Sequence, residues 1–93
     1  MKIQYFTSTL PSGIKQTTKV YELDRGEEIP IHSHDFWHNC LVIKGSVCVY
    51  DDTGKSASIE SGKYVEFNAG RIHAIKAIES DTLIVNINEP GHV

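Results

Sequence analysis

The sequence has no long hydrophobic run and no excess of positive charge. No apolar stretch approaches the roughly 18 residues that a membrane-spanning helix needs, so we expect no membrane span. Nine Lys and Arg residues against 12 Asp and Glu residues give a formal net charge of −3. This balance argues against a nucleic-acid partner, which needs a basic surface, and against binding to an anionic membrane.

Signal peptides and disulfide patterns are also missing. Residues 1–7 contain no apolar core of a secretory signal, so we expect a cytoplasmic protein. The two cysteines, Cys40 and Cys48, are too few for a disulfide scaffold and are not spaced as C-x-x-C, so we expect free thiols. The 93 residues allow a single domain, 1–93, whose small core would need support from a bound metal, a partner subunit or both.

No segment keeps apolar residues at the i, i+3, i+4, i+7 spacing of an amphipathic helix over three turns. Short β-rich runs alternate instead with turn sequences rich in Gly, Asp, Asn and Ser. Strands are predicted at 2–7, 17–23, 29–34, 38–43, 46–50, 56–60, 63–68, 72–78 and 82–88. Regularly spaced short strands without helices predict an all-β fold, which would be a sandwich, a jelly roll or a small barrel.

Lys44-Gly45 lies between two Val- and Ile-rich runs and predicts a tight hairpin of 38–43 with 46–50. One face of this hairpin would carry His38, Cys40, Val42, Val47 and Val49. The opposite face would carry Leu41, Ile43, Cys48 and Tyr50. Because both faces are apolar, we expect a second layer, the N-terminal strand or a second subunit to cover the outer one. The two cysteines point to opposite faces, which disfavours a disulfide between them.

Histidines provide the main chemical signal. His32 and His34 are two residues apart, and on a strand they would share a face about 6.6 Å apart, close enough to converge on one metal ion. His34 and His38 have the i, i+4 spacing of a helical zinc site, but Pro30 and the β-rich flanks oppose a helix. The cluster alone leaves two interpretations open: a metal site, or partly exposed histidines on a strand. The last histidine, in the Pro-Gly tail, is His92, which we expect to take no part.

The spacing of these residues resembles the two sequence motifs of the cupin family. The first motif matches Gly26, then after five residues His32-Ser33-His34, after three more His38, and after a further six Gly45. The second matches Gly62, then after five residues Asn68-Ala69-Gly70, and after two more His73. Three positions depart from the family pattern: His38 stands at a glutamate, Asn68 at a proline and Ala77 at an asparagine. The resemblance covers residues 26–77.

This resemblance implies a double-stranded β-helix, the jelly-roll barrel of cupins, with a pocket at one end. It implies a divalent transition metal held by His32, His34, His38 and His73. Imidazole ligands are compatible with Zn, Fe, Ni, Mn and Cu, so the metal is not identified. Four neutral ligands would leave the charge of the ion uncompensated and favour an anionic ligand. A second interpretation is that His38 lines the pocket without binding.

The resemblance further implies a metal-dependent enzyme of the dioxygenase, isomerase or lyase type, acting on a small anionic molecule. The alternative is a non-catalytic cupin that binds or senses a small ligand. Strand alternation predicts a small, mostly apolar cavity lined by Cys40, Val42, Val65, Phe67, Ile75, Ala77, Leu83, Val85 and Ile87. No catalytic acid or base is identified: Glu66 and Arg71 are the nearest candidates, and both fit exposed surface charges better.

The N-terminal run suggests an oligomer. Ile3, Tyr5 and Phe6 would form an apolar edge strand, which is an aggregation liability unless something covers it. A second copy of the chain could protect this edge and cover the outer face of 38–50. We therefore expect a homodimer, the commonest symmetric oligomer. The alternative is that the N-terminal segment folds back over its own barrel.

Overall fold

The computed structural model describes residues 1–92, and strands dominate this part of the chain. They are β1 (Lys2–Thr9), β2 (Lys15–Leu23), β3 (Glu28–His32), β4 (His38–Lys44), β5 (Ser46–Tyr50), β6 (Ser56–Glu60), β7 (Tyr64–Phe67), β8 (His73–Ala77) and β9 (Thr82–Asn88). Each lies where a strand is predicted, with ends that differ by at most two residues. Within residues 1–92 there is no helix, and therefore none that could cross a membrane.

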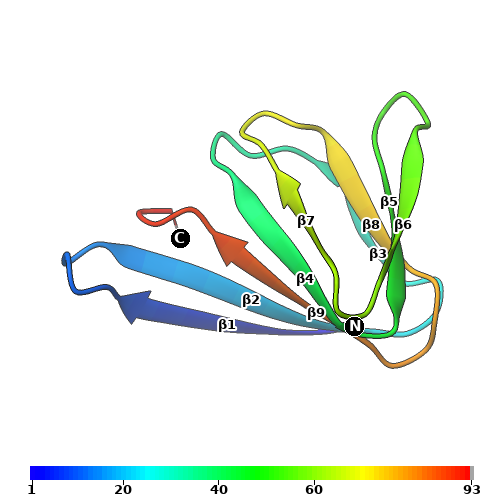
Figure 1. Cartoon of the computed structure of the whole chain (residues 1–93), viewed down its shortest axis with the longest axis horizontal. Helices are drawn as coiled ribbons and strands as arrows, with labels where there is room; N and C mark the ends of the chain where they lie inside the picture. Colours follow the sequence, from blue (N-terminus) through cyan, green and yellow to red (C-terminus); the bar gives the residue numbers. More distant parts are fainter. Residues whose placement is uncertain (93) are drawn as a thin grey trace.

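The strands form two antiparallel sheets that face each other and splay apart toward one end (Figure 1). The five-stranded sheet has the order β1-β2-β9-β4-β7, and the four-stranded sheet has the order β3-β8-β5-β6. After β2 the chain crosses from sheet to sheet at nearly every connection, and β5 and β6 alone are consecutive strands in one sheet. This winding is that of a double-stranded β-helix, so the predicted all-β jelly roll is confirmed.

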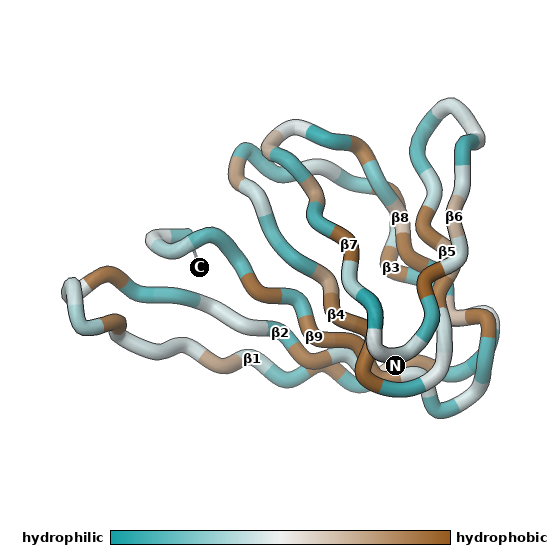
Figure 2. Tube along the Cα trace, viewed as in Figure 1, coloured by the Kyte–Doolittle hydropathy of each residue, from teal (hydrophilic) through white to brown (hydrophobic). Residues whose placement is uncertain are grey.

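Apolar side chains fill the space between the sheets. The buried cluster consists of Tyr21, Leu23, Ile29, Cys40, Val42, Val47, Val49, Phe67, Ile75, Ala77 and Ile84. Hydrophobic positions gather toward the end of the barrel where the two sheets converge (Figure 2). The burial of this cluster supplies the main driving force for folding. It leaves the splayed end of the barrel for polar side chains.

The hairpin predicted around Lys44-Gly45 is wrong. β4 pairs with β7 and β9, whereas β5 pairs with β6 and β8 in the other sheet. Gly45 has a φ of +80° and lies directly against Thr82, so the chain passes between the sheets at this point instead of turning back on itself. A strand pair with two apolar faces fits either arrangement, which is why the sequence pattern did not distinguish them. The inner set His38, Cys40, Val42, Val47 and Val49 is nevertheless buried as predicted, and both cysteines are free.

The inner face of β9 also differs from the prediction. Thr82, Ile84, Asn86 and Asn88 are buried toward the interior, whereas Leu83, Val85 and Ile87 are half-buried on the outer face. Hydrophobicity alone predicts that Leu83, Val85 and Ile87 point inward. The register of the sheet decides which face of β9 points inward, because Ile84 pairs with Val42 and Asn86 pairs with the buried Cys40. The interior is therefore more polar than the sequence pattern predicts.

β1 forms an edge of the five-stranded sheet and is exposed along its whole length. It pairs with β2 from Lys2 to Thr9, and this hairpin projects beyond the four-stranded sheet (Figure 1). Tyr5 and Phe6 lie on opposite faces of β1 and are 65% and 54% exposed. The N-terminal strand thus extends the sheet sideways and leaves the outer face of β4 uncovered, where Ile43 is 52% exposed.

Candidate functional site

His32 and His73 are cross-strand partners where β3 pairs with β8. β3 ends at His32 and β8 begins at His73, so both imidazoles stand at the splayed end of the four-stranded sheet. The pairing is irregular between Ile29 and His32, where Pro30 has no N–H to donate to the ladder. The two ring centroids are 4.4 Å apart.

The same local contact orients both rings. Nδ1–H of His32 donates to the carbonyl of Pro30 at 2.6 Å, and Nδ1–H of His73 donates to the carbonyl of Arg71 at 2.9 Å. Because a carbonyl can only accept, the hydrogen is on Nδ1 and the lone pair is on Nε2. The Nε2 atom of His73 is buried and has no hydrogen-bond partner. This is how metal-binding histidines are commonly oriented.

His34 lies in the loop 33–37, beyond the end of β3, and not on the strand as predicted. Its ring centroid is 4.7 Å from that of His32 and 6.2 Å from that of His73. Phe36 stacks on His34 with a centroid separation of 4.8 Å and helps to hold it there. One ring nitrogen from each of His32, His34 and His73 lies within 4.8 Å of the other two. The ring nitrogens therefore converge as predicted, although His34 lies in a loop and not on a strand.

His38 lies beside this triad at the start of β4. Its ring centroid is 5.2 Å from His34 and 5.0 Å from His73, but it is not part of the set whose nitrogens converge within 4.8 Å. The side chain is 2% exposed, and its Nδ1 is buried without a hydrogen-bond partner. All four predicted histidines are therefore at one end of the barrel, three of them as a tight group and the fourth immediately behind.

Burial lowers the pKa of His34, His38 and His73 and so favours their neutral forms. It lowers the pKa of His38 to about 3, with smaller contributions from His73, His34, His32 and Lys19. Burial also lowers the pKa of His73 to about 4, although the hydrogen bond to Arg71 opposes the shift. The pKa of His34 is lowered for the same reason, helped by His32 and Lys19. Neutral imidazole is the form that binds metal ions, so at neutral pH His34, His38 and His73 need lose no proton to do so.

A cavity of about 380 Å³ opens onto His32, His34 and His38 from the β2 side. Its lining consists of Lys19, Tyr21, Ile29, Pro30, Ile31, His32, His34, His38 and Asn86. Lys19, Tyr21 and Asn86 were not predicted as site residues. The alternation of β2 could have placed Lys19 with the buried Tyr21 and Leu23, whereas Asn86 was missed because the face of β9 was chosen by hydrophobicity. The pocket is consequently polar on one side, in contrast to the apolar cavity predicted.

The two acid–base candidates from the sequence lie elsewhere. Glu66 is exposed on β7. Arg71 is exposed and lines a separate cavity of about 170 Å³ together with His73, Tyr50 and Lys55. Its guanidinium carbon lies 5.8 Å from the centre of the Phe67 ring. The structure therefore brings Arg71, but not Glu66, close to a ring of the histidine cluster.

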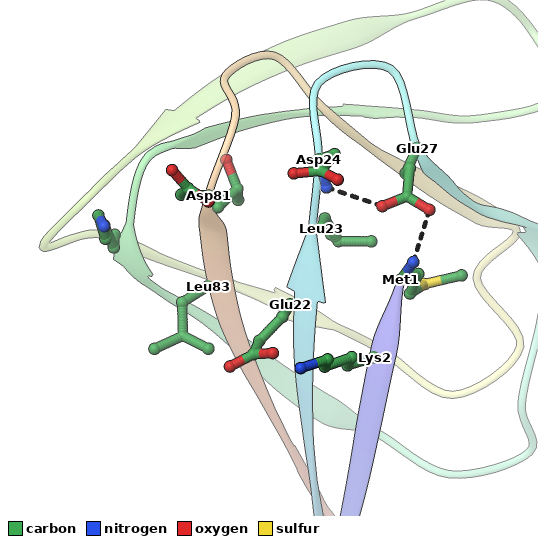
Figure 3. A pocket seen from close by; sticks show the side chains of 10 residues that line it. Met1, Lys2, Glu22, Leu23, Asp24, Glu27, Asp81 and Leu83 are labelled. Carbon is green, nitrogen blue, oxygen red and sulfur yellow. Dashed lines mark hydrogen bonds and ion pairs between the residues drawn. The ribbon is translucent and has the colours of Figure 1, made fainter.

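A further cavity, of about 490 Å³, lies at the opposite end of the barrel (Figure 3). Its lining includes Leu23 and Thr82, the last residue of β2 and the first of β9. Carboxylates surround it, and that of Glu27 accepts hydrogen bonds from the amino group of Met1 at 2.7 Å and from the backbone N–H of Asp24 at 2.8 Å. Contacts of this kind hold a turn in place, so we assign no chemistry to this cavity.

The C-terminal tail contacts the histidine loop, which the sequence did not suggest. His92 stacks on Phe36 with a centroid separation of 4.6 Å, so His34, Phe36 and His92 form a continuous stack. The backbone N–H of Glu89 donates to the carbonyl of Trp37 at 2.9 Å, and the Glu89 carboxylate accepts from the N–H of Trp37 at 3.3 Å. His92 is therefore no bystander, because it braces the loop that carries His34.

Comparison with known proteins establishes the family. A family model described as a cupin domain matches residues 19–87, most of the chain and all four histidines of the site. The chain therefore belongs to the cupin family, as the motif spacing predicts. A search of curated proteins gives no match.

Solved structures share the fold. KdgF from Halomonas sp. is 17% identical with a TM-score of 0.74, over 95% of this chain and 89% of that one. Oxalate decarboxylase from Bacillus subtilis is 23% identical with a TM-score of 0.81, over 98% of this chain but 26% of its own. A Klebsiella pneumoniae protein described as having a double-stranded β-helix domain is 20% identical with a TM-score of 0.73, over 83% of this chain and 69% of that one. At these identities the likeness shows the fold alone.

Proposed function

We propose that this protein, as a single cupin domain over residues 1–93, is a metal-dependent enzyme that acts on a small anionic molecule. One observation carries the proposal: ring nitrogens of His32, His34 and His73 converge within 4.8 Å of one another. They do so beside a cavity whose lining includes no Asp or Glu. A dioxygenase, isomerase or lyase reaction would suit such a site.

The residues fit a divalent transition metal. His32, His34 and His73 would be its ligands, and His38 would be the fourth. A buried Nε2 without a partner on His73 is unfavourable in a folded protein unless something occupies it. The Nδ1 of His38 is likewise buried without a partner, which supports His38 as the fourth ligand. Among the similar structures, oxalate decarboxylase is described as having Mn(II) centres.

The chemistry of the site divides between the ion and the chain. When bound, the metal would supply a Lewis acid with open positions for an oxygen of the substrate. Neutral imidazole ligands do not neutralise the charge of the ion, so anions are favoured. Phe36 and His92 hold His34 in place, and the carbonyls of Pro30 and Arg71 fix the tautomers of His32 and His73. These contacts preorganise the ligand set.

A non-catalytic cupin that binds or senses a small ligand is the second candidate. It is favoured by the position of the two charged candidates: Glu66 is exposed and Arg71 lines a different cavity, so neither is a general acid or base in the main pocket. Tyr21 does line the pocket, and burial, the main cause, together with Tyr5 and Cys40 raises its pKa. It would act as a neutral hydrogen-bond donor under either function.

Metal analysis and turnover separate the two candidates. Untagged protein purified without chelator should contain about one transition metal ion per chain, since the ligand set describes one centre. The metal-loaded protein would then be incubated with oxoacids, thiols and catechols. Turnover of one class supports the enzyme, and tight ligand binding without turnover supports the sensor. If metal-free protein takes up no Mn, Fe, Co, Ni, Cu or Zn, the proposed metal site is wrong, whether it has three histidine ligands or four.

We also propose a homodimer in the cytoplasm. Phe6, Val20, Leu41, Tyr64 and Val85 lie on the outer face of the five-stranded sheet by their register. Tyr64 is 67% exposed and Phe6 is 54% exposed, so this face is apolar and open. A second copy of the sheet would bury it and cover the β1 edge. The proposed cytoplasmic location agrees with the two free thiols.

A further inference from the structure

We propose that Lys19 binds a carboxylate of the substrate and that Asn86 beside it accepts a hydrogen bond from a hydroxyl of the same molecule. The substrate class is thus a small hydroxycarboxylic acid with a further oxygen group that reaches the histidines. This inference deepens the proposed function and rests on it. It follows from the inner face of β2 and β9, which the histidine motifs do not include.

Lys19 is placed on the floor of the histidine cavity. It lies on β2, between Tyr5 on β1 and Asn86 on β9 in the register of the sheet. Lys19 and Asn86 line the same cavity of about 380 Å³ as His34 and His38. The Lys19 ammonium lies 5.8 Å from the centre of the Tyr5 ring, a cation–π contact that holds the side chain along the sheet. A cavity of this size suits a small molecule.

The charge of Lys19 is not neutralised by the protein. Among residues 1–92 the ion pairs are those of Glu27 with the Met1 amino group and of Glu89 with His92, and neither includes Lys19. No Asp or Glu lines the cavity. Lys19 is half-buried, and its ammonium has no carboxylate partner among the described residues, so a bound anion would stabilise its charge. Its effect on the pKa values of His34 and His38 agrees with this proximity.

The side chain of Asn86 independently indicates that the bound acid carries a hydroxyl. This side chain is 6% exposed, and its Oδ1 atom is buried without a hydrogen-bond partner. An amide oxygen can only accept, so its missing partner is a donor. A carboxylate at Lys19 cannot supply that donor, whereas a hydroxyl on the neighbouring carbon can. Lys19 and Asn86 are directly paired across β2 and β9, so one small molecule can meet both.

The test uses malate as the probe, with succinate as its analogue without the hydroxyl and acetate as a small monocarboxylate that has neither the hydroxyl nor the second carboxylate. Cobalt-loaded protein would be titrated near pH 7 with each acid, including both malate enantiomers, and followed by the visible absorption of Co²⁺. Lys19→Gln should weaken malate binding about tenfold, as expected for a lost charged hydrogen bond, and change acetate binding by less than about threefold. Lys19→Arg should keep malate affinity, and Lys63→Gln, at an exposed turn, is the matched control for net charge.

A second measurement follows the side-chain amide of Asn86 by ¹⁵N NMR in metal-free protein. Malate should shift this resonance more than succinate does, and Lys19→Gln should abolish the shift. Equal malate affinity of cobalt-loaded wild type and Lys19→Gln overturns the inference while leaving the metal site intact. Failure of the wild type to bind cobalt counts against the proposed function instead. In that case the NMR titration decides: a malate shift that needs Lys19 supports the anion site, and no shift overturns it.

Discussion

Phe67 stacks face to face on His73, with ring centroids 3.9 Å apart and 15° between the ring planes. Phe67 comes from β7 in the five-stranded sheet and His73 from β8 in the four-stranded sheet. The stack therefore joins the two sheets at the histidine end of the barrel. It couples the packing of the core to the position of a proposed metal ligand.

Phe67→Leu should destabilise the metal-free protein by on the order of 1 kcal/mol, because it keeps apolar volume but removes the aromatic stack. It should also weaken metal affinity, since His73 loses the surface that holds its ring. Urea unfolding and metal titration measure the two effects. Lys76→Gln, on the exposed face of β8, is the control and should change stability by less than about 0.5 kcal/mol. Equal effects of the two substitutions would contradict the role of the stack.

His32→Ala and His73→Ala should each abolish stoichiometric metal binding. Each removes a ligand from a different strand, and no other side chain at that position can replace it. His38→Ala should cause a smaller loss if three imidazoles suffice, and His38→Glu should retain binding, because glutamate is the residue at this position of the family motif. The measurement is metal content after dialysis. Lys76→Ala, on the exposed face of β8, serves as the control, and full metal content in both His32→Ala and His73→Ala would show that the cluster is structural.

Metal binding should raise the melting temperature, because the unfolded chain does not present the site. A chelator should reverse the increase at neutral pH. The increase should fade as the pH falls, because imidazolium cannot bind a metal. Differential scanning calorimetry with and without metal measures the effect. A melting temperature that is insensitive to chelator in metal-loaded protein would contradict a metal that bridges β3 and β8.

The metal-free protein should lose stability as the pH falls from about 6.5 toward 4. The pKa values of His38 and His73 are lowered to about 3 and about 4, so the unfolded chain takes up these protons first. Stability therefore rises with pH in this window, by up to about 1.4 kcal/mol per pH unit for each histidine. Urea unfolding at pH 7, 6 and 5 measures the slope. His38→Asn should flatten it, Lys76→Gln on the exposed face of β8 should not, and an unfolding free energy independent of pH would refute the assignment.

The homodimer predicts a mass near twice the 10.4 kDa of the chain in size exclusion coupled to light scattering at micromolar concentration. Phe6→Lys and Tyr64→Lys place charges on the proposed contact face and should shift the mass toward that of one chain. Lys76→Gln, on the other sheet, should leave it unchanged. A wild-type mass near 10.4 kDa would rule the dimer out.

Strand positions were predictable because turn residues interrupt the sequence at regular intervals, and every strand lies within two residues of its expected bounds. Pairing was not. The pattern around Gly45 fits a hairpin and a sheet crossing equally, because both place apolar residues on both faces. Only contacts with distant residues, such as that of Gly45 with Thr82, decide between them.

The site was predictable where motif spacing carries it and unpredictable where it depends on the choice of a strand face. His32, His34 and His73 converge as the motifs imply, although His34 lies in a loop. Asn86 was missed because β9 alternates between an apolar outer face and a partly polar inner one, and hydrophobicity selects the wrong phase. His92 was missed because its contact with Phe36 joins parts of the chain far apart in sequence.

The stack of His34, Phe36 and His92 has a practical consequence for purification. A hexahistidine tag fused after residue 93 would begin close to His92. It would therefore lie close in space to the proposed ligand His34, through the stack with Phe36. Its imidazoles could compete with His34 for the same ion and raise the apparent metal stoichiometry. An affinity tag placed before Met1 would start at the opposite end of the barrel, beside Glu27. Expression vectors for metal analysis should therefore carry a cleavable N-terminal tag.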